Sequence, residues 1–479
     1  MIFQIKYLNM LFILALSSQA WAITGGEDDD LGFLPPVGNE TAEVMESTKS
    51  QKIFQTVKKR DFRFTLDNTL QSTQIKDVAD SVFTLPNESH PNWNNLTRLG
   101  MQANKTIYKN LSAKTDLLFN VYTRESGVFN ASEDVRLDIK EAYVSWQKSP
   151  TLFFDVGRVN IKNGIATGFN PTDYFKVGTV LDRNTEDVSQ LRDARLGAFL
   201  MQGQKLWEGG STTVTVSPKI NYKANSWSSD KNITGLNLHK SNDRSRVLLR
   251  LTHEMSDGFS PEIIYYSESG KHNLGLNLSK DLNKKMFVYM EWNIGNRRKL
   301  IDEALLDARA LNQLSPEMSQ IFNTDGGEQY LQQLAIGASF TSASNITTKL
   351  EYHFNEAGLS KAEAQKWFDL GLNTNNPAVV GQLLSVRGLA QSRGEMLGKH
   401  RLFLYSTWKD AGMDDLDLTG LIMSDLNDSS NLLQVKMAYS LNKKTEVSLQ
   451  AAKFTGSSDS FYGSLNQDSS VTLGLKYDF

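Results

Sequence analysis

The last nine residues, VTLGLKYDF, alternate strictly between large apolar and small or polar side chains. The apolar set is Val471, Leu473, Leu475, Tyr477 and Phe479. Successive side chains of a β-strand point to opposite faces, so this period of two predicts a strand with one apolar face. A soluble domain usually ends in a frayed polar tail. We therefore expect this terminal strand to be paired within a larger sheet.

The same alternation recurs along most of the chain after residue 60. It is clear at 62–70, 213–220, 246–251, 273–279, 349–354, 433–441 and 446–451. The phase changes near Lys140–Glu141 and near Gly157, where we expect β-bulges. Alternation over so many segments predicts antiparallel strands, each with one apolar face.

The connections between these segments alternate in length. Short polar turns fall near residues 109, 147, 208, 256, 282, 342, 410 and 441, and the mostly longer connections fall at 76–95, 161–194, 222–244, 298–328, 355–398 and 456–468. This pattern is typical of transmembrane barrels with short periplasmic turns and long extracellular loops. The sequence therefore predicts an all-β transmembrane antiparallel β-barrel of about 16–18 strands over residues 61–479.

Two other architectures are disfavoured. A soluble sandwich with so many strands would need two or three domains, but no linker divides the chain, and no repeat of solenoid or propeller length is visible. A helical membrane protein is excluded, because no stretch after the N-terminus approaches about 18 consecutive apolar residues.

The N-terminus carries a different signal. Lys6, the apolar run 10–16 and the small residues around Trp21 predict a secretory signal peptide at 1–22. We expect residues 23–60 to form a periplasmic segment, either a tail or a small plug helix. The chain has no Cys, which excludes a lipoprotein anchor, disulfides and thiolate metal sites.

The composition and motifs also exclude several functions. A net charge of −3 shows no basic footprint for nucleic acid. The six His residues form no HExxH pair, and GxSxG, Walker A and dinucleotide fingerprints are absent. We therefore expect no enzymatic activity, no cofactor and no metal site.

One long loop stands out. Residues 157–197 read GRVNIKNGIATGFNPTDYFKVGTVLDRNTEDVSQLRDARLG, which is too long for a passive turn. Asn170 before Pro171 favours the start of either a turn or a helix; in a helix, Asn170 would be the N-cap and Asp173 a capping partner. The loop either folds into the lumen or lies on the outer rim, and we favour the lumen. Its candidate constriction residues are Asn170, Asp173, Lys176, Arg183 and Arg192.

The polar face of the strands should line the lumen. Candidate constriction residues on this face are Arg246, Arg250, Glu291, Lys349 and Glu351. The same face carries Arg63, Asp67, Arg98, Glu254, Lys436, Glu446, Lys476 and Asp478. Charged rings set ion selectivity in pores, so a mixture of both signs predicts modest selectivity at most.

The signal peptide, the alternating strands and the terminal LKYDF resemble Gram-negative outer-membrane β-barrel proteins of the porin-like kind. In that class a final strand ending in Phe acts as an assembly signal, which implies this role for Tyr477 and Phe479. GRVNIKNGIATGFNPTDYF also resembles a strand-to-loop motif of porin-like proteins. The resemblance implies an outer-membrane location, with membrane lipid and the barrel assembly machinery as partners. A homotrimer stays open, because trimers are common among porins.

Two functions follow as expectations. The first is a porin-like channel for passive diffusion of small hydrophilic solutes, narrowed by the loop at 164–195. The second is an outer-membrane scaffold or export component whose barrel is plugged and which acts with periplasmic or surface partners. The strand number is similar to that of substrate-specific porins for sugars or small acids, but no motif identifies a solute.

Overall fold

The computed structural model describes most of the chain after residue 60. The described residues are 61–76, 93–125, 134–177, 179, 191–192, 194–220, 234–256, 258–310, 327–372, 380, 383–384, 386–388 and 393–479. The expected signal peptide at 1–22, the segment at 23–60 and Arg183 lie outside these residues.

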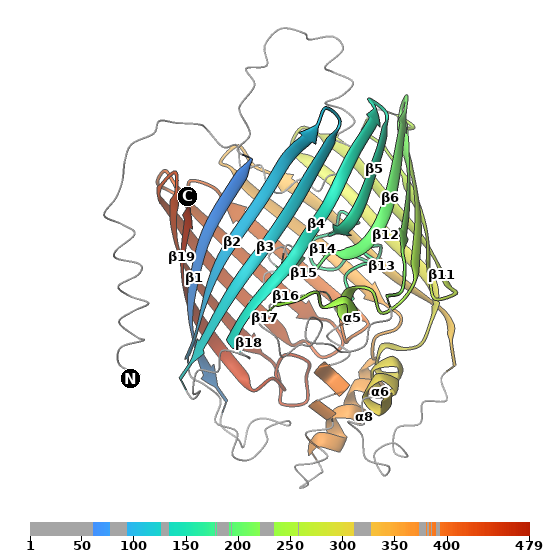
Figure 1. Ribbon diagram of the computed structural model, residues 1–479. Coiled ribbons are helices and arrows are strands. Elements are labelled where there is room, and N and C mark those ends of the chain that lie inside the picture. The colour runs from blue at the N-terminus through green and yellow to red at the C-terminus, as the bar shows by residue number, and fades with distance from the viewer. Residues whose placement is uncertain are drawn as a thin grey trace. The chain divides into compact units, whose positions relative to one another are not determined.

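Eighteen antiparallel strands, β1–β7 and β9–β19, close into one barrel within the described part of the chain (Figure 1). β19 closes the ring by pairing with β1. β7 pairs directly with β9, since β8 is a two-residue strand that lies parallel to β4. The predicted antiparallel barrel is confirmed.

The strand bounds are β1 Phe62–Ile75, β2 Trp93–Tyr108, β3 Leu111–Arg124, β4 Val135–Ser149, β5 Leu152–Val159, β6 Ala198–Trp207, β7 Gly210–Ser217, β8 Thr234–Gly235, β9 Arg246–His253, β10 Glu262–Glu268, β11 Lys271–Asn283, β12 Met286–Arg297, β13 Gln329–Thr341, β14 Ile346–Asn355, β15 His400–Trp408, β16 Leu416–Asp425, β17 Asn431–Asn442, β18 Thr445–Thr455 and β19 Gln467–Asp478. The helices are α5 Leu238–Ser241, α6 Leu300–Ala310 and α8 Lys361–Leu372.

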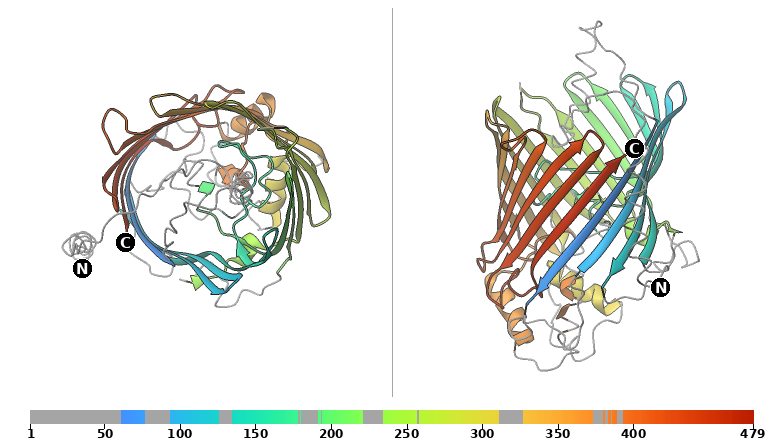
Figure 2. Two further views of the ribbon diagram at one scale, coloured as in Figure 1. Left: turned by 90° about the horizontal axis from the view of Figure 1, so that it is seen from above. Right: turned by 90° about the vertical axis from the view of Figure 1, so that its left-hand side faces the viewer.

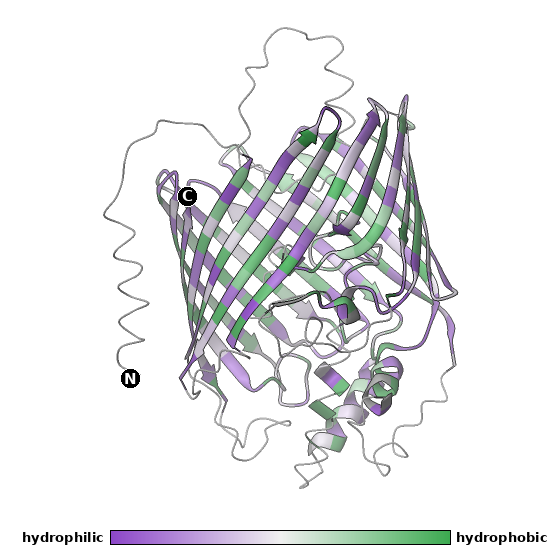
Figure 3. Cartoon of the chain, in the orientation of Figure 1, coloured by the Kyte–Doolittle hydropathy of each residue, from purple (hydrophilic) through white to green (hydrophobic). Residues whose placement is uncertain are grey.

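The two faces of the barrel wall differ in polarity. Leu70, Leu99, Leu449 and Leu473 are large apolar residues of the outward face, and they are 42%, 43%, 43% and 51% exposed. Figure 3 shows the alternation of apolar and polar residues along each strand. A closed barrel leaves no unpaired edge, and an apolar exterior suits a bilayer. The protein is therefore an outer-membrane barrel, as the sequence predicts.

The expected turns and bulges can be compared with the register. The short turns join consecutive strands at one end, while most long connections lie at the other. Two connections at the loop end are nevertheless short: Ser269–Gly270 between β10 and β11, and residues 426–430 between β16 and β17. The bulge near Lys140 is confirmed, because the β3–β4 register skips Lys140. The bulge near Gly157 is wrong: around this residue β5 keeps its register with both neighbours, and Gly157 instead has a φ of 134°.

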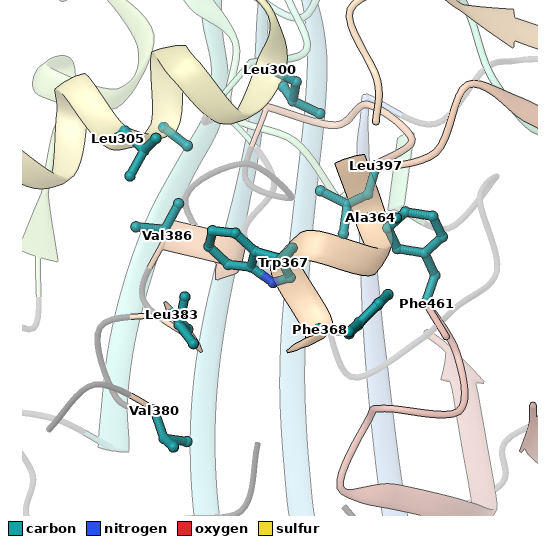
Figure 4. Close-up of a cluster of buried hydrophobic side chains, with 11 residues drawn as sticks. Leu300, Leu305, Ala364, Trp367, Phe368, Val380, Leu383, Val386, Leu397 and Phe461 are labelled. Atoms are coloured by element: carbon teal, nitrogen blue, oxygen red, sulfur yellow. The ribbon is translucent and has the colours of Figure 1, made fainter. Parts of the chain in front are cut away.

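The long connections around α6 and α8 form a small apolar cluster at the loop end of the barrel (Figure 4). Leu300 and Leu305 of α6 pack together with Trp367 and Phe368 of α8 and with Phe461. None of the helices in the described ranges is long and apolar enough to cross a membrane.

A capping box begins α8. Glu363 accepts a hydrogen bond from the backbone N–H of Ser360 at 2.8 Å, which is the reciprocal cap expected for S-x-x-E. Lys299 pairs with the same carboxylate. Partial burial raises the pKa of Glu363, but hydrogen bonds from Lys299 and Ser360 lower it to about 2. The two loops are thus joined at their first turns.

Candidate functional site

The connection between β5 and β6, residues 160–197, is called the inner loop here. Figure 2 shows the stretch after β5 lying inside the ring of strands. Its apolar residues Ile165, Ala166 and Phe169 are 5%, 0% and 4% exposed, although they belong to a loop. They are covered because the inner loop packs against the inward face of the barrel wall.

Glu291 on β12 is the first anchor of the inner loop. Its carboxylate accepts the backbone N–H groups of Ile165 and Ala166, the latter at 2.5 Å. It also accepts hydrogen bonds from the Thr172 hydroxyl at 3.1 Å and the Asn170 amide at 3.3 Å. The Glu291 side chain is fully buried, and these donors replace the water that it has lost.

Glu351 on β14 is the second anchor. It accepts the backbone N–H groups of Thr167 at 2.7 Å and Gly168 at 2.8 Å. The Tyr289 hydroxyl donates to it at 2.5 Å, and His353 Nε2 lies 2.7 Å away. The two carboxylates therefore bind four consecutive peptide groups, 165–168, which fixes the inner loop to two strands of the opposite wall.

Gly164 lets the inner loop approach Glu291. Its φ is 85°, and a Cβ at this position would lie 2.5 Å from both Glu291 oxygens. Only glycine combines this backbone conformation with such a close approach.

Asp173 joins two parts of the inner loop through ion pairs. Its carboxylate lies 2.9 Å from Arg195 Nη1 and 3.6 Å from Arg192 Nε, and Arg192 also donates to the Asn163 carbonyl at 2.5 Å. Of the turn and the helix that Asn170–Pro171 allows, the structure has the turn, because residues 171–177 form turns. Asp173 binds arginines instead of capping a helix.

The other predicted residues have different surroundings. Lys349 of β14 donates to the Thr167 hydroxyl at 3.1 Å, close to the two anchors. Arg250 of β9 donates to the Asn163 side chain at 3.4 Å. Lys176 donates to the Asn170 carbonyl at 2.7 Å.

Arg246 is placed elsewhere. It pairs with Asp243 at 3.0 Å and with Glu268 at 3.3 Å, at the loop-side ends of β9 and β10. Arg246 is therefore part of an ion cluster at the barrel rim, apart from the anchors of the inner loop.

A second segment, 393–398, crosses the inward side of the wall near the same loop, and we call it the mouth segment. Its residue Glu395 accepts two hydrogen bonds of 2.8 Å from Arg297 of β12 and one of 3.0 Å from Gln333 of β13. Arg393 pairs with Glu303 of α6 at 2.7 Å. These ion pairs join the apolar cluster of α6 and α8 to the barrel wall.

Of three comparisons with known proteins, the one with solved structures finds similar folds. No protein-family model and no curated protein matches the sequence. Among solved structures, Acinetobacter baumannii OccAB1 shares 8% identity at a TM-score of 0.51, over 87% of this chain and 96% of that chain. Pseudomonas aeruginosa OccK11 (OpdR) has a TM-score of 0.47 at 10% identity, over 87% and 95% of the two chains.

The fold is that of a porin-like outer-membrane β-barrel. At 8% identity the likeness to OccAB1 extends to the fold alone. The expectation of a porin-like barrel is confirmed at that level.

Some residues of this site were not among the predicted ones. Asn163 and Arg195 belong to the inner loop and bind Arg192 and Asp173 within it, and Tyr289 and His353 contact the anchor Glu351. The alternation places Tyr289 and His353 on the lumen face, beside Glu291 and Glu351. His353 lies two residues from Glu351 on β14, but Tyr289 and Glu351 are 62 residues apart, so the sequence does not show the contact between them.

Proposed function

We propose that this protein is a channel for passive diffusion of small hydrophilic solutes across the outer membrane, and that the inner loop narrows its lumen. The observation that carries the proposal is the binding of peptide groups 165–168 to Glu291 and Glu351. A barrel of this strand number can enclose an aqueous interior. A loop held against the inward wall reduces the cross-section left for solutes.

The polar lumen face supports a water-filled path. The side chains of Arg63, Lys476 and Asp478 are 51%, 40% and 26% exposed. They lie on the inward face of β1 and β19, near the turn end of the barrel. Exposed charges of both signs favour hydrophilic solutes over apolar ones.

Planar-bilayer recording tests the channel. Purified, heat-modifiable protein is expected to give stepwise KCl currents, and liposomes that contain it are expected to swell in small sugars but not in large oligosaccharides. Folded protein that gives no current at any voltage would contradict the proposal.

A scaffold or export role is the second candidate, and one observation favours it. The cluster of α6, α8 and Phe461 gathers at the loop end of the barrel and is tied to the wall through the mouth segment. If the cluster closes the mouth, current is expected only after residues 361–392 are removed. Current from the intact chain favours the diffusion channel.

We also propose that Tyr477 and Phe479 serve as the signal read by the barrel assembly machinery. Their rings meet edge to face, with centroids 4.9 Å apart, at the end of the closing strand. Phe479→Ser is expected to lower the amount of heat-modifiable protein in the outer membrane severalfold. Phe340→Ser, at an outward aromatic position 49% exposed, is the matched control. Equal assembly of both variants would contradict a role specific to Phe479.

A further inference from the structure

Four charged residues of alternating sign lie side by side on neighbouring strands. Glu446 of β18 is opposite Lys476 of β19. Lys476 is opposite Asp67 of β1, and Asp67 is opposite Arg98 of β2. The order of charges is negative, positive, negative, positive. We call these residues the charged row.

The charged row faces the lumen. Leu70, Leu99, Leu449 and Leu473 on the same four strands are outward and exposed. Each charged residue is separated from the leucine of its strand by an odd number of positions, so it points to the opposite face. The row therefore lies on the inner wall.

The charged row runs obliquely across the barrel wall. Rows of paired residues run across the strands, and the strands of such barrels tilt by about 35–45°. Glu446 is also opposite Ser440, next to the turn after β17. At its other end the row continues from Arg98 through Asn120 to Arg136, near the loop-side start of β4. It thus leads from the turn end toward the loop end.

The charged row lies on a different part of the wall from the anchors. The inner loop is hydrogen-bonded to β4, β9, β11, β12 and β14, none of which carries a residue of the charged row. Glu291 and Glu351 beneath it are 0% exposed. Lys476 keeps 40% of its side chain exposed. A solute that passes the inner loop can therefore reach the charged row.

The spacing of the charged row selects a solute class. Neighbouring strands lie about 4.8 Å apart, so two opposite charges of the row lie close enough together for the carboxylate and the ammonium of one small molecule to contact both. A simple ion at any point of the row is attracted by one neighbour and repelled by the next. A zwitterion can satisfy two neighbours at once. We propose that the charged row is a binding track for small zwitterionic solutes bearing an amine and a carboxylate. This inference rests on the proposed channel function.

Glycine and glycolamide provide the test, because they are isomers and only glycine is zwitterionic. Liposome swelling with the full chain is expected to show faster entry of glycine than of glycolamide, and this preference should shrink as salt is raised. In the variant Lys476→Met with Asp67→Asn, which keeps the net charge, the glycine-to-glycolamide ratio is expected to fall about threefold.

The control is Lys453→Met with Asp468→Asn. It removes another opposite-charge pair, 2.6 Å apart on β18 and β19, and Lys453 lies on the outward face. Its ratio is expected to match that of the unaltered chain. If the Lys476→Met, Asp67→Asn variant also keeps the original glycine-to-glycolamide ratio and its KCl conductance, the binding track is contradicted but the channel function is not. Absence of KCl current with the unaltered chain would instead contradict the channel function.

Discussion

Replacing Glu291 and Glu351 together by Gln is expected to release the inner loop and enlarge the pore. Each carboxylate accepts two backbone N–H groups of 165–168. Hydrogen bonds to a charged acceptor contribute about 1.5–3 kcal/mol each. A Gln side chain keeps only one acceptor oxygen and turns a donor toward the loop. The anchoring of the inner loop should therefore fall by several kcal/mol.

Single-channel recording checks this prediction. The double variant is expected to show a higher mean conductance and larger current fluctuations, and its liposomes should admit larger sugars. Asp116→Asn is the control, since it removes a carboxylate of β3 that pairs with Lys140 at 3.0 Å and belongs neither to the anchors nor to the charged row. A folded double variant with the original conductance, noise and size limit would show that the loop does not set the constriction.

Glu395→Gln is expected to loosen the mouth segment. Glu395 and Arg297 form a buried ion pair, with side chains 8% and 14% exposed. Breaking such a pair by removing one charge costs about 3–5 kcal/mol, because the remaining charge stays buried. Arg393 is only 8% exposed in the intact chain. Cleavage by a trypsin-like protease after Arg393 should become many times faster in the variant.

The pH dependence of the mouth segment has a definite sign. Burial raises the pKa of Glu395, but Arg297 and Lys176 outweigh it and hold the pKa below the usual carboxyl range. A lowered pKa stabilises the folded state above the unfolded value, and this contribution is lost as pH falls through the folded pKa. Protection of Arg393 should therefore be complete at neutral pH and decline only in strong acid.

Two further variants make the result specific. Glu328→Gln removes a carboxylate that pairs with Lys271 at 2.9 Å, where both side chains are 34% exposed. An exposed pair contributes about 0–1 kcal/mol, so this variant should be cleaved at the original rate. Arg297→Met with Glu395→Met removes both charges and should be less susceptible than Glu395→Gln. Equal cleavage rates of all variants would contradict the conclusion that the ion pair of Glu395 and Arg297 holds the mouth segment in place.

Much of the fold could be predicted from the local pattern of apolar and polar residues in the sequence. Period-two alternation in segments such as VTLGLKYDF identifies a strand, its two faces and, through the turns, its neighbours. The pairing of Leu473 with Leu70 then follows from closure of the ring. The local pattern left both a turn and a helix open at Pro171, and the turn forms, because Asp173 binds Arg195 and Arg192 and does not cap a helix.

The sequence by itself determined the strands, their lipid and lumen faces and the membrane compartment, because each depends on neighbouring residues and on the polarity of the solvent they meet. Only the tertiary structure decided which lumen carboxylates bind the inner loop. Glu291 and Ile165 are 126 residues apart, and Glu351 and Thr167 are 184 apart. No local period encodes such contacts. They arise because a closed barrel brings distant strands around one interior, where buried carboxylates must find donors.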